Sequence, residues 1–151
     1  MVESGRKGMS FTGEYHHNLD AKGRLIIPAK FREGLGNEFT VTRSLGGCLA
    51  MYSAEEWEAL EDKLDALPFT NSKARDLKRF LLGSACTCEL DKQGRILIPQ
   101  TLREKADLKK DIVLLGVGNN IEIWDADKYF EKYHDFEDEE QLEQDWENLG
   151  V

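Results

Sequence analysis

The sequence has no apolar run approaching the roughly 20 residues that cross a bilayer as a helix. Its first residues, Met1–Gly8, are polar and no apolar segment follows them, so we expect neither a membrane anchor nor a secretory signal peptide. Hydrophobic residues make up 40% of the 151 residues and charged residues 32%. These proportions are typical of an ordinary globular protein, and the chain is long enough to bury a core.

Cysteine and histidine are scarce, which argues against several kinds of site. The three cysteines, Cys48, Cys86 and Cys88, form no pair with each other or with a histidine at zinc-finger spacing. Cys86 and Cys88 alternate within a strand-like stretch, so both thiols should point to the same face. We therefore expect buried structural thiols in a reducing, cytosolic setting, and no metal site.

Catalytic motifs are missing as well. No Ser/His/Asp or Cys/His combination is indicated, and Gly116-Val-Gly118 lacks the further glycine and the lysine of a phosphate-binding loop. We expect no enzyme activity and no cofactor.

The chain has no excess of basic residues, since its net charge is −9. Residues 125–151 carry all of that charge, with eleven acidic side chains against Lys128 and Lys132. Residues 1–124 are balanced overall, and residues 1–32 carry a net charge of +3. Local charge governs a binding face more than the total does, so the composition does not exclude a DNA-binding protein.

The sequence repeats itself at a shift of 71 residues. Leu19–Arg32 matches Leu90–Arg103 with seven identities in fourteen positions, where chance gives roughly one. After a one-residue insertion, Leu49–Tyr52 matches Ile121–Trp124, and Trp57 matches Tyr129. The chain therefore contains an internal duplication.

Each copy has the pattern of a short β-rich unit. Asp20 and Gly23 suit a type I turn in which glycine takes a positive φ, and Asp91 and Gly94 occupy the same places in the second copy. Proline then favours the first turn of a helix, which in the first copy we expect to end at Gly34. In the first copy we expect strands at 15–19, 24–27, 38–43 and 48–52. In the second copy we expect the turn at 91–95, strands at 96–98, 112–115 and 120–124, and a helix from Pro99 to about residue 106.

Helices are expected between the copies and after them. One begins at Ser53 with Glu56 in a capping box and ends before Pro68, and a second spans 72–82. In the tail, apolar residues recur at helical spacing on an acidic helix broken near Asp138: Tyr129, Tyr133, Phe136, Leu142, Trp146 and Leu149. We expect this stripe to dock on the body of the protein. The alternative is that the acidic face repels or mimics DNA.

Two β-rich copies with open strand edges bury their cores best by packing together. The pattern Asp-x-x-Gly-Arg-[Leu/Ile]-x-Ile-Pro-x-x-[Phe/Leu]-Arg resembles the AbrB/SpoVT family, whose hairpins interlock between two copies. Its duplication in one chain, with Leu81-Leu-Gly83 ending the linker and Glu122-Ile-Trp-Asp125 closing the second copy, resembles the MraZ family in particular. The likeness extends from residue 11 to about 145.

The resemblance implies an α+β fold in which two AbrB-like swapped-hairpin β-barrel repeats pack as an intramolecular pseudo-dimer. The organisation we expect is a flexible segment at 1–10, a first repeat at 11–57, a helical linker at 58–83, a second repeat at 84–130 and an acidic helical tail at 131–151.

The resemblance also implies a cytoplasmic, nucleoid-associated regulator that assembles into a ring-like homo-oligomer. Such a regulator binds double-stranded DNA at promoter repeats ahead of a division and cell-wall gene cluster that includes its own gene. In that family the turn arginine contacts DNA, which carries over to Arg24 and, through the repeat, to Arg95. Lys22 and Lys92 lie on the same turns but at inequivalent positions, since Lys22 aligns with Gln93.

Three other interpretations stay open. Arg24 and Arg95 could simply pair with Asp20 and Asp91 across the turn, although exposed pairs contribute only about 0–1 kcal/mol. The turns could bind a protein partner within an oligomeric interaction module. The chain could also be an antitoxin-like AbrB protein.

Overall fold

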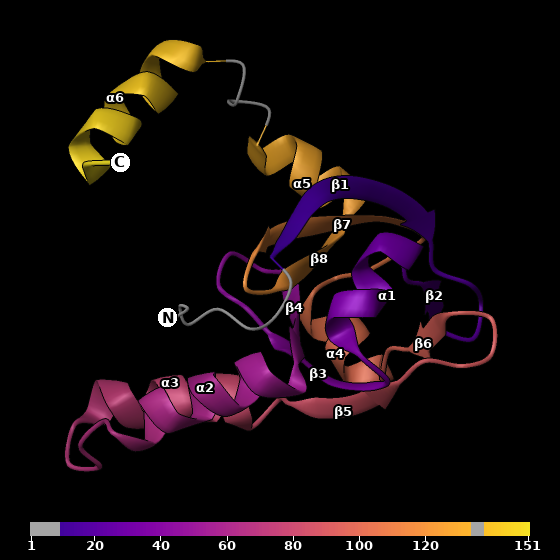
Figure 1. Ribbon diagram of the computed structural model, residues 1–151, viewed down its shortest axis with the longest axis horizontal. Helices are drawn as coiled ribbons and strands as arrows, with labels where there is room; N and C mark the ends of the chain where they lie inside the picture. Colours follow the sequence, from indigo (N-terminus) through magenta and orange to yellow (C-terminus); the bar gives the residue numbers. More distant parts are fainter. Residues whose placement is uncertain (1–9, 134–137) are drawn as a thin grey trace, which may run out of the picture.

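The computed structural model describes residues 10–133 and 138–151. Almost all of the segment expected to be flexible, and Phe136 of the predicted apolar stripe, lie outside these residues. Both copies of the repeat are described in full (Figure 1).

The two copies have the same order of elements. The first consists of β1 (Phe11–Asn18), β2 (Arg24–Ile26), α1 (Ala29–Leu35), β3 (Glu38–Arg43) and β4 (Leu49–Ser53). The second consists of β5 (Cys86–Glu89), β6 (Arg95–Leu97), α4 (Gln100–Lys105), β7 (Asp111–Gly118) and β8 (Ile121–Asp125). Between them lie α2 (Ala54–Asp65) and α3 (Ser72–Leu82), and α5 (Ala126–Tyr133) and α6 (Glu139–Leu149) follow.

The strands of the two copies interlock. The six-stranded antiparallel sheet has the order β1-β7-β8-β4-β3-β5, so a first-copy strand pairs with β7 and a second-copy strand pairs with β3. The return strand β2 does not pair with β1 but forms a separate two-stranded ribbon with β6. Each hairpin therefore opens beyond its turn and completes the other copy, which is the swapped-hairpin arrangement.

The register of the ribbon shows how closely the copies mirror each other. Leu25 pairs with Ile96, its own counterpart in the repeat, while Arg24 pairs with Leu97 and Ile26 with Arg95. A pseudo-twofold axis consequently passes through the Leu25–Ile96 pair.

The duplication is also visible in aromatic contacts away from the ribbon. Tyr52 and Trp57 lie 5.7 Å apart between ring centroids in the first copy, and Trp124 and Tyr129 lie 5.8 Å apart in the second. The repeat aligns Tyr52 with Trp124 and Trp57 with Tyr129, and the two aligned pairs of rings pack at almost the same separation.

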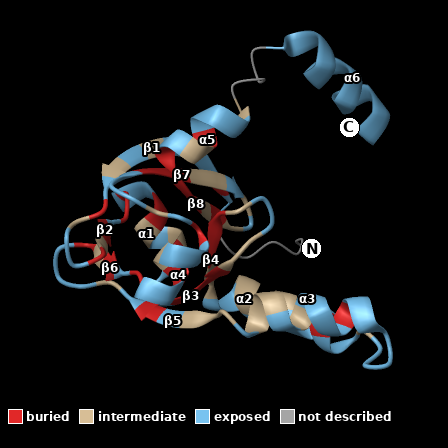
Figure 2. Ribbon diagram, turned by 180° about the vertical axis from the view of Figure 1, so that it is seen from behind, coloured by how far each residue is buried: buried red, intermediate tan, exposed pale blue. Residues whose placement is uncertain are grey.

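One core is shared by both copies. Its fully buried side chains include Leu25, Ile27, Ile96 and Ile98, each at most 1% exposed, which approach from the two hairpins. Phe31 of α1 packs edge-to-face against Tyr15, with ring centroids 5.0 Å apart. The buried residues cluster where the sheet, the ribbon and the short helices meet (Figure 2).

The first short helix is longer than predicted. Gly34 lies inside α1, and the helix ends at Leu35. Gly36 caps it with φ 76° and donates its N–H to the Arg32 carbonyl. Leu35 is buried at 2% exposure, so packing of this side chain keeps the helix going past Gly34.

The linker helices begin where the sequence predicts, at Ala54 after the Ser53 cap and at Ser72. Ser53 Oγ accepts a hydrogen bond from the Glu56 N–H at 3.3 Å, and Asn71 Oδ1 accepts one from Ala74 N–H at 3.1 Å. α2 and α3 lie side by side and project from the body (Figure 1). No helix in the described part of the chain is long and apolar enough to span a membrane.

The tail behaves differently in its two halves. Tyr129 of α5 is buried against Trp124, as the apolar stripe predicts. α6 has no buried residue, and Trp146 and Leu149 are 65% and 78% exposed. The prediction that the whole stripe docks is therefore wrong for α6, which stands away from the rest of the described chain (Figure 1).

Candidate nucleic-acid interface

The first turn is built by the side chain of Asp20. Its Oδ1 accepts hydrogen bonds from the backbone N–H groups of Lys22 and Arg24 at 2.9 and 2.8 Å. The Gly23 N–H donates to the Asp20 carbonyl at 3.0 Å, and Gly23 takes φ 85°, a conformation that glycine adopts without strain. Asp20 is thus a turn-forming residue.

Asp20 also orients the arginine that follows the turn. Arg24 Nε donates to Asp20 Oδ2 at 2.7 Å, and the Arg24 side chain is 33% exposed. The hydrogen bond from the Arg24 backbone N–H, together with the guanidinium, holds the pKa of Asp20 below its usual 3.8. This contact uses only Nε, and the terminal nitrogens that make bidentate contacts to guanine or phosphate are not part of it.

The second turn repeats this geometry. Asp91 Oδ1 accepts from the backbone N–H of Arg95 at 2.9 Å, and Oδ2 accepts from Arg95 Nε at 2.8 Å. Gly94 has φ 76°. The backbone N–H of Arg95 likewise keeps the pKa of Asp91 low.

The two turns differ in one contact. Arg95 Nη2 donates to Gln93 Oε1 at 2.6 Å, so one terminal nitrogen of this guanidinium is already engaged. Lys22 takes the place of Gln93 in the first copy, and a lysine ammonium has no lone pair to accept such a bond. Lys22 and Lys92 are both exposed. At this position the first turn carries a positively charged residue, Lys22, and the second turn carries a neutral hydrogen-bond acceptor, Gln93.

Each turn is also held by the other copy. The Gly23 carbonyl accepts from the Ile98 N–H, and the Gly94 carbonyl accepts from the Ile27 N–H, both at 2.9 Å. A Cβ placed on Gly23 would lie 2.6 Å from Cζ of Arg103, so this guanidinium covers the glycine.

Arg32 packs on Gly94 in the same crosswise manner. The Nε atoms of Arg32 and Arg103 are buried and donate no hydrogen bond. Sequence reasoning placed both residues on short helices but missed this packing. The sequence signal that could have indicated this packing is that both copies have arginine at this position of the repeat.

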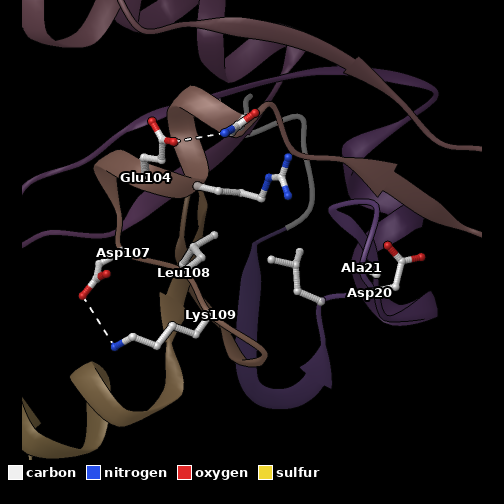
Figure 3. A pocket seen from close by; sticks show the side chains of 9 residues that line it. Asp20, Ala21, Glu104, Asp107, Leu108 and Lys109 are labelled. Carbon is white, nitrogen blue, oxygen red and sulfur yellow. Dashed lines mark hydrogen bonds and ion pairs between the residues drawn. The ribbon is translucent and has the colours of Figure 1, made fainter.

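A polar pocket of about 610 Å³ opens beside the first turn. Asp20 and Ala21 lie on one side of it, and Glu104, Asp107 and Lys109 of the second copy lie on the other (Figure 3). Its acidic residues outnumber its basic ones, which does not favour an anionic ligand. Among residues 10–133 and 138–151, no group of three or more side chains is placed to hold a metal ion.

The duplication seen in the structure agrees with comparisons to known proteins. The model of a family described as MraZ protein, whose description also calls it antitoxin-like, matches residues 10–80 and again residues 81–149. A protein of Clostridium beijerinckii named transcriptional regulator MraZ is 50% identical over 93% of this chain and 99% of its own length. The protein of the same name in Natranaerobius thermophilus is 49% identical over 93% of this chain and 94% of its own.

A third relative with that name, from Desulfitobacterium hafniense, is 57% identical over 76% of this chain and 80% of its own length. These matches run through both repeats and agree with the interlocked hairpins. This chain belongs to the MraZ family.

Proposed function

We propose that this chain is a sequence-specific DNA-binding transcriptional regulator in which Arg24 and Arg95 contact the DNA. Its target is a set of repeated elements in the promoter of a division and cell-wall gene cluster that includes its own gene. It acts without catalysis, in the cytoplasm and associated with the nucleoid. The relatives' shared name, transcriptional regulator, supports this class of function.

The observation that carries the proposal is the matched pair of anchored arginines. In each copy an aspartate fixes the Nε side of the guanidinium at 2.7 or 2.8 Å and leaves the opposite edge outside the contact. A side chain oriented in advance loses less conformational entropy when it binds. The ion pair across the turn and a DNA contact are thus compatible, because the pair positions the arginine for the contact.

The two copies should not contribute equally. Binding DNA through both terminal nitrogens of Arg95 requires the bond to Gln93 to be broken or shared, whereas Lys22 adds a positive charge beside Arg24. We therefore expect Arg24 to contribute more affinity than Arg95. Lys22 and Lys92 contact phosphates and contribute mainly salt-dependent affinity.

Tight binding also requires several chains. Within residues 10–133 and 138–151, one chain presents only two basic turns. So few phosphate contacts support non-specific dissociation constants of about 10⁻⁴–10⁻⁶ M. A regulator needs about 10⁻⁸ M or tighter against competing genomic sites. A ring-like homo-oligomer that presents the turns at fixed spacing makes each further engagement intramolecular, which raises avidity by about 10²–10⁴.

The direct test is a mobility shift with DNA from upstream of the chain's own gene, against a scrambled duplex of equal composition. Arg24→Ala should weaken binding by about 1–3 kcal/mol for each bidentate pair of hydrogen bonds that it removes, and Arg95→Ala by less. Lys30→Ala is a suitable control, because it removes one positive charge from an exposed site on the neighbouring α1. If Arg24→Ala is folded by circular dichroism and binds as tightly as the unchanged protein, the assignment fails.

A further inference from the structure

The outward face of the β2–β6 ribbon carries two aliphatic side chains in addition to its arginines. Side chains alternate between the faces of a strand, so Arg24 shares a face with Ile26, and Arg95 with Leu97. Leu25 and Ile96 occupy the opposite face and are buried at 0% and 1% exposure. The arginine face therefore points outward.

Ile26 and Leu97 are open to solvent on this face, at 46% and 59% exposure. The register places Leu97 directly opposite Arg24 and Ile26 directly opposite Arg95. On this face, each arginine therefore has an aliphatic residue beside it on its own strand and another directly opposite it on the partner strand. We call these four residues the ribbon face.

Single exposed aliphatic residues are common and need no explanation. Here, however, both copies have an exposed aliphatic residue two positions after the turn arginine, and each of these residues is adjacent to both arginines. Strand propensity does not require it, because a polar β-branched residue such as threonine suits an exposed strand equally well. A hydrophobic group at this position gains most if the surface that meets the arginines also offers an apolar group.

In DNA, that apolar group is the C5-methyl of thymine. The major groove admits a two-stranded β-ribbon, and the thymine methyl is the apolar group on its floor. Guanine O6 and N7, which bind arginine bidentately, lie in the same groove. The minor groove is about 6 Å wide and offers only hydrogen-bonding groups. The composition of the ribbon face thus matches the chemistry of the major groove.

We propose that Ile26 and Leu97 contact thymine methyl groups and are sequence-determining residues for this chain. The inference rests on the proposed DNA-binding function and adds the base feature that is read. It places a thymine close to each guanine or phosphate that a turn arginine contacts. The arginines supply most of the affinity, and the two aliphatic residues supply a preference for thymine over other pyrimidines.

The test removes only the methyl groups. The upstream duplex is prepared with thymine or with uracil, which pairs identically but lacks the C5-methyl, and both are titrated with the full chain and with Ile26→Ser/Leu97→Ser. The full chain should bind the uracil duplex about fourfold more weakly for each methyl that it touches, the factor for exposing one methylene-sized group. The double variant should bind thymine and uracil duplexes equally.

Val117→Ser serves as the matched control. Val117 is 42% exposed on β7, outside the ribbon, so this variant should remain as sensitive to uracil as the full chain. Molecular mass by light scattering is measured for all three proteins, because an aliphatic face could instead pack against a second copy. A double variant of reduced assembly size would make the face a protein interface and overturn the proposal.

The remaining outcomes separate this inference from the function on which it rests. If the full chain binds both duplexes equally while Arg24→Ala still weakens binding, the methyl contact is refuted and the DNA-binding function stands. Equal sensitivity to uracil in the full chain and the double variant refutes it as well. If the full chain binds neither duplex, the proposed function itself has failed.

Discussion

Gly116 lies where the first copy is paired to the second, and filling it should destabilise that pairing. It is opposite Gly13 in the β1–β7 ladder. A methyl group at Gly116 would lie 2.5 Å from the Thr12 nitrogen and 2.6 Å from the Phe11 carbonyl carbon. These are backbone atoms, so no rotamer change relieves the clash, and β1 has to move.

The expected cost of Gly116→Ala follows from that geometry. Forcing an extra carbon into a packed region typically costs about 1–3 kcal/mol. For a chain of this size, each kcal/mol lowers Tm by about 2–4 °C. Gly116→Ala should therefore lower Tm by roughly 2–12 °C, measured by circular dichroism and checked by urea unfolding.

Val117→Ala is the matched control on the same strand. Its side chain is 42% exposed, so the change should stay within about 0.5 kcal/mol of the unaltered protein. The reasoning is refuted if Gly116→Ala and Val117→Ala unfold alike, because β1 then does not lie against β7 as the interlocked fold requires.

Three further results are expected. Residues 138–151 are acidic and contain no basic side chain, so deleting them should raise the affinity for DNA at low salt. The gain should shrink as added salt screens the repulsion. Equal affinity at low salt would show that the tail does not oppose DNA binding. Burial raises the pKa of Cys48 and of Cys88 to about 12, so both thiols should resist alkylation at pH 8 until the chain unfolds, and rapid labelling of the folded protein would contradict this. The pKa values of Asp20 and Asp91 in the folded protein lie below 3.8, so the two carboxylates stabilise the fold above the pKa of the unfolded chain, and this stabilisation is lost as the pH falls through the folded-state pKa. In the variant with asparagine at both positions, Tm should therefore fall less steeply between about pH 5 and 3. An unchanged profile of Tm against pH would exclude this contribution.

Much of the local structure follows from the sequence. The Asp-x-x-Gly spacing predicts both turns, because the aspartate side chain and the left-handed glycine are local requirements. The capping box at Ser53 fixes the start of the first linker helix for the same reason. The shift of 71 residues makes the pseudo-twofold arrangement predictable before any contact is known.

Tertiary contacts account for what the sequence did not predict. Alternation identifies β2 as a strand but does not say that it pairs with β6, because the choice of partner depends on the whole core. The position of Gly34 inside α1 depends on the burial of Leu35. The crosswise packing of Arg103 on Gly23 involves residues 80 apart, and no local pattern encodes such a contact.

The central claim is that the two turn arginines contact DNA, and one titration tests it most directly. Fluorescence anisotropy of the upstream duplex is measured across roughly 50–200 mM salt, for the unchanged chain and for Arg24→Ala/Arg95→Ala. The double variant should stay folded and assembled, bind at the level of a scrambled duplex, and show a salt slope reduced by about one for each arginine that contacts a phosphate. A folded double variant that keeps both the affinity and the salt slope of the unchanged chain would contradict the account.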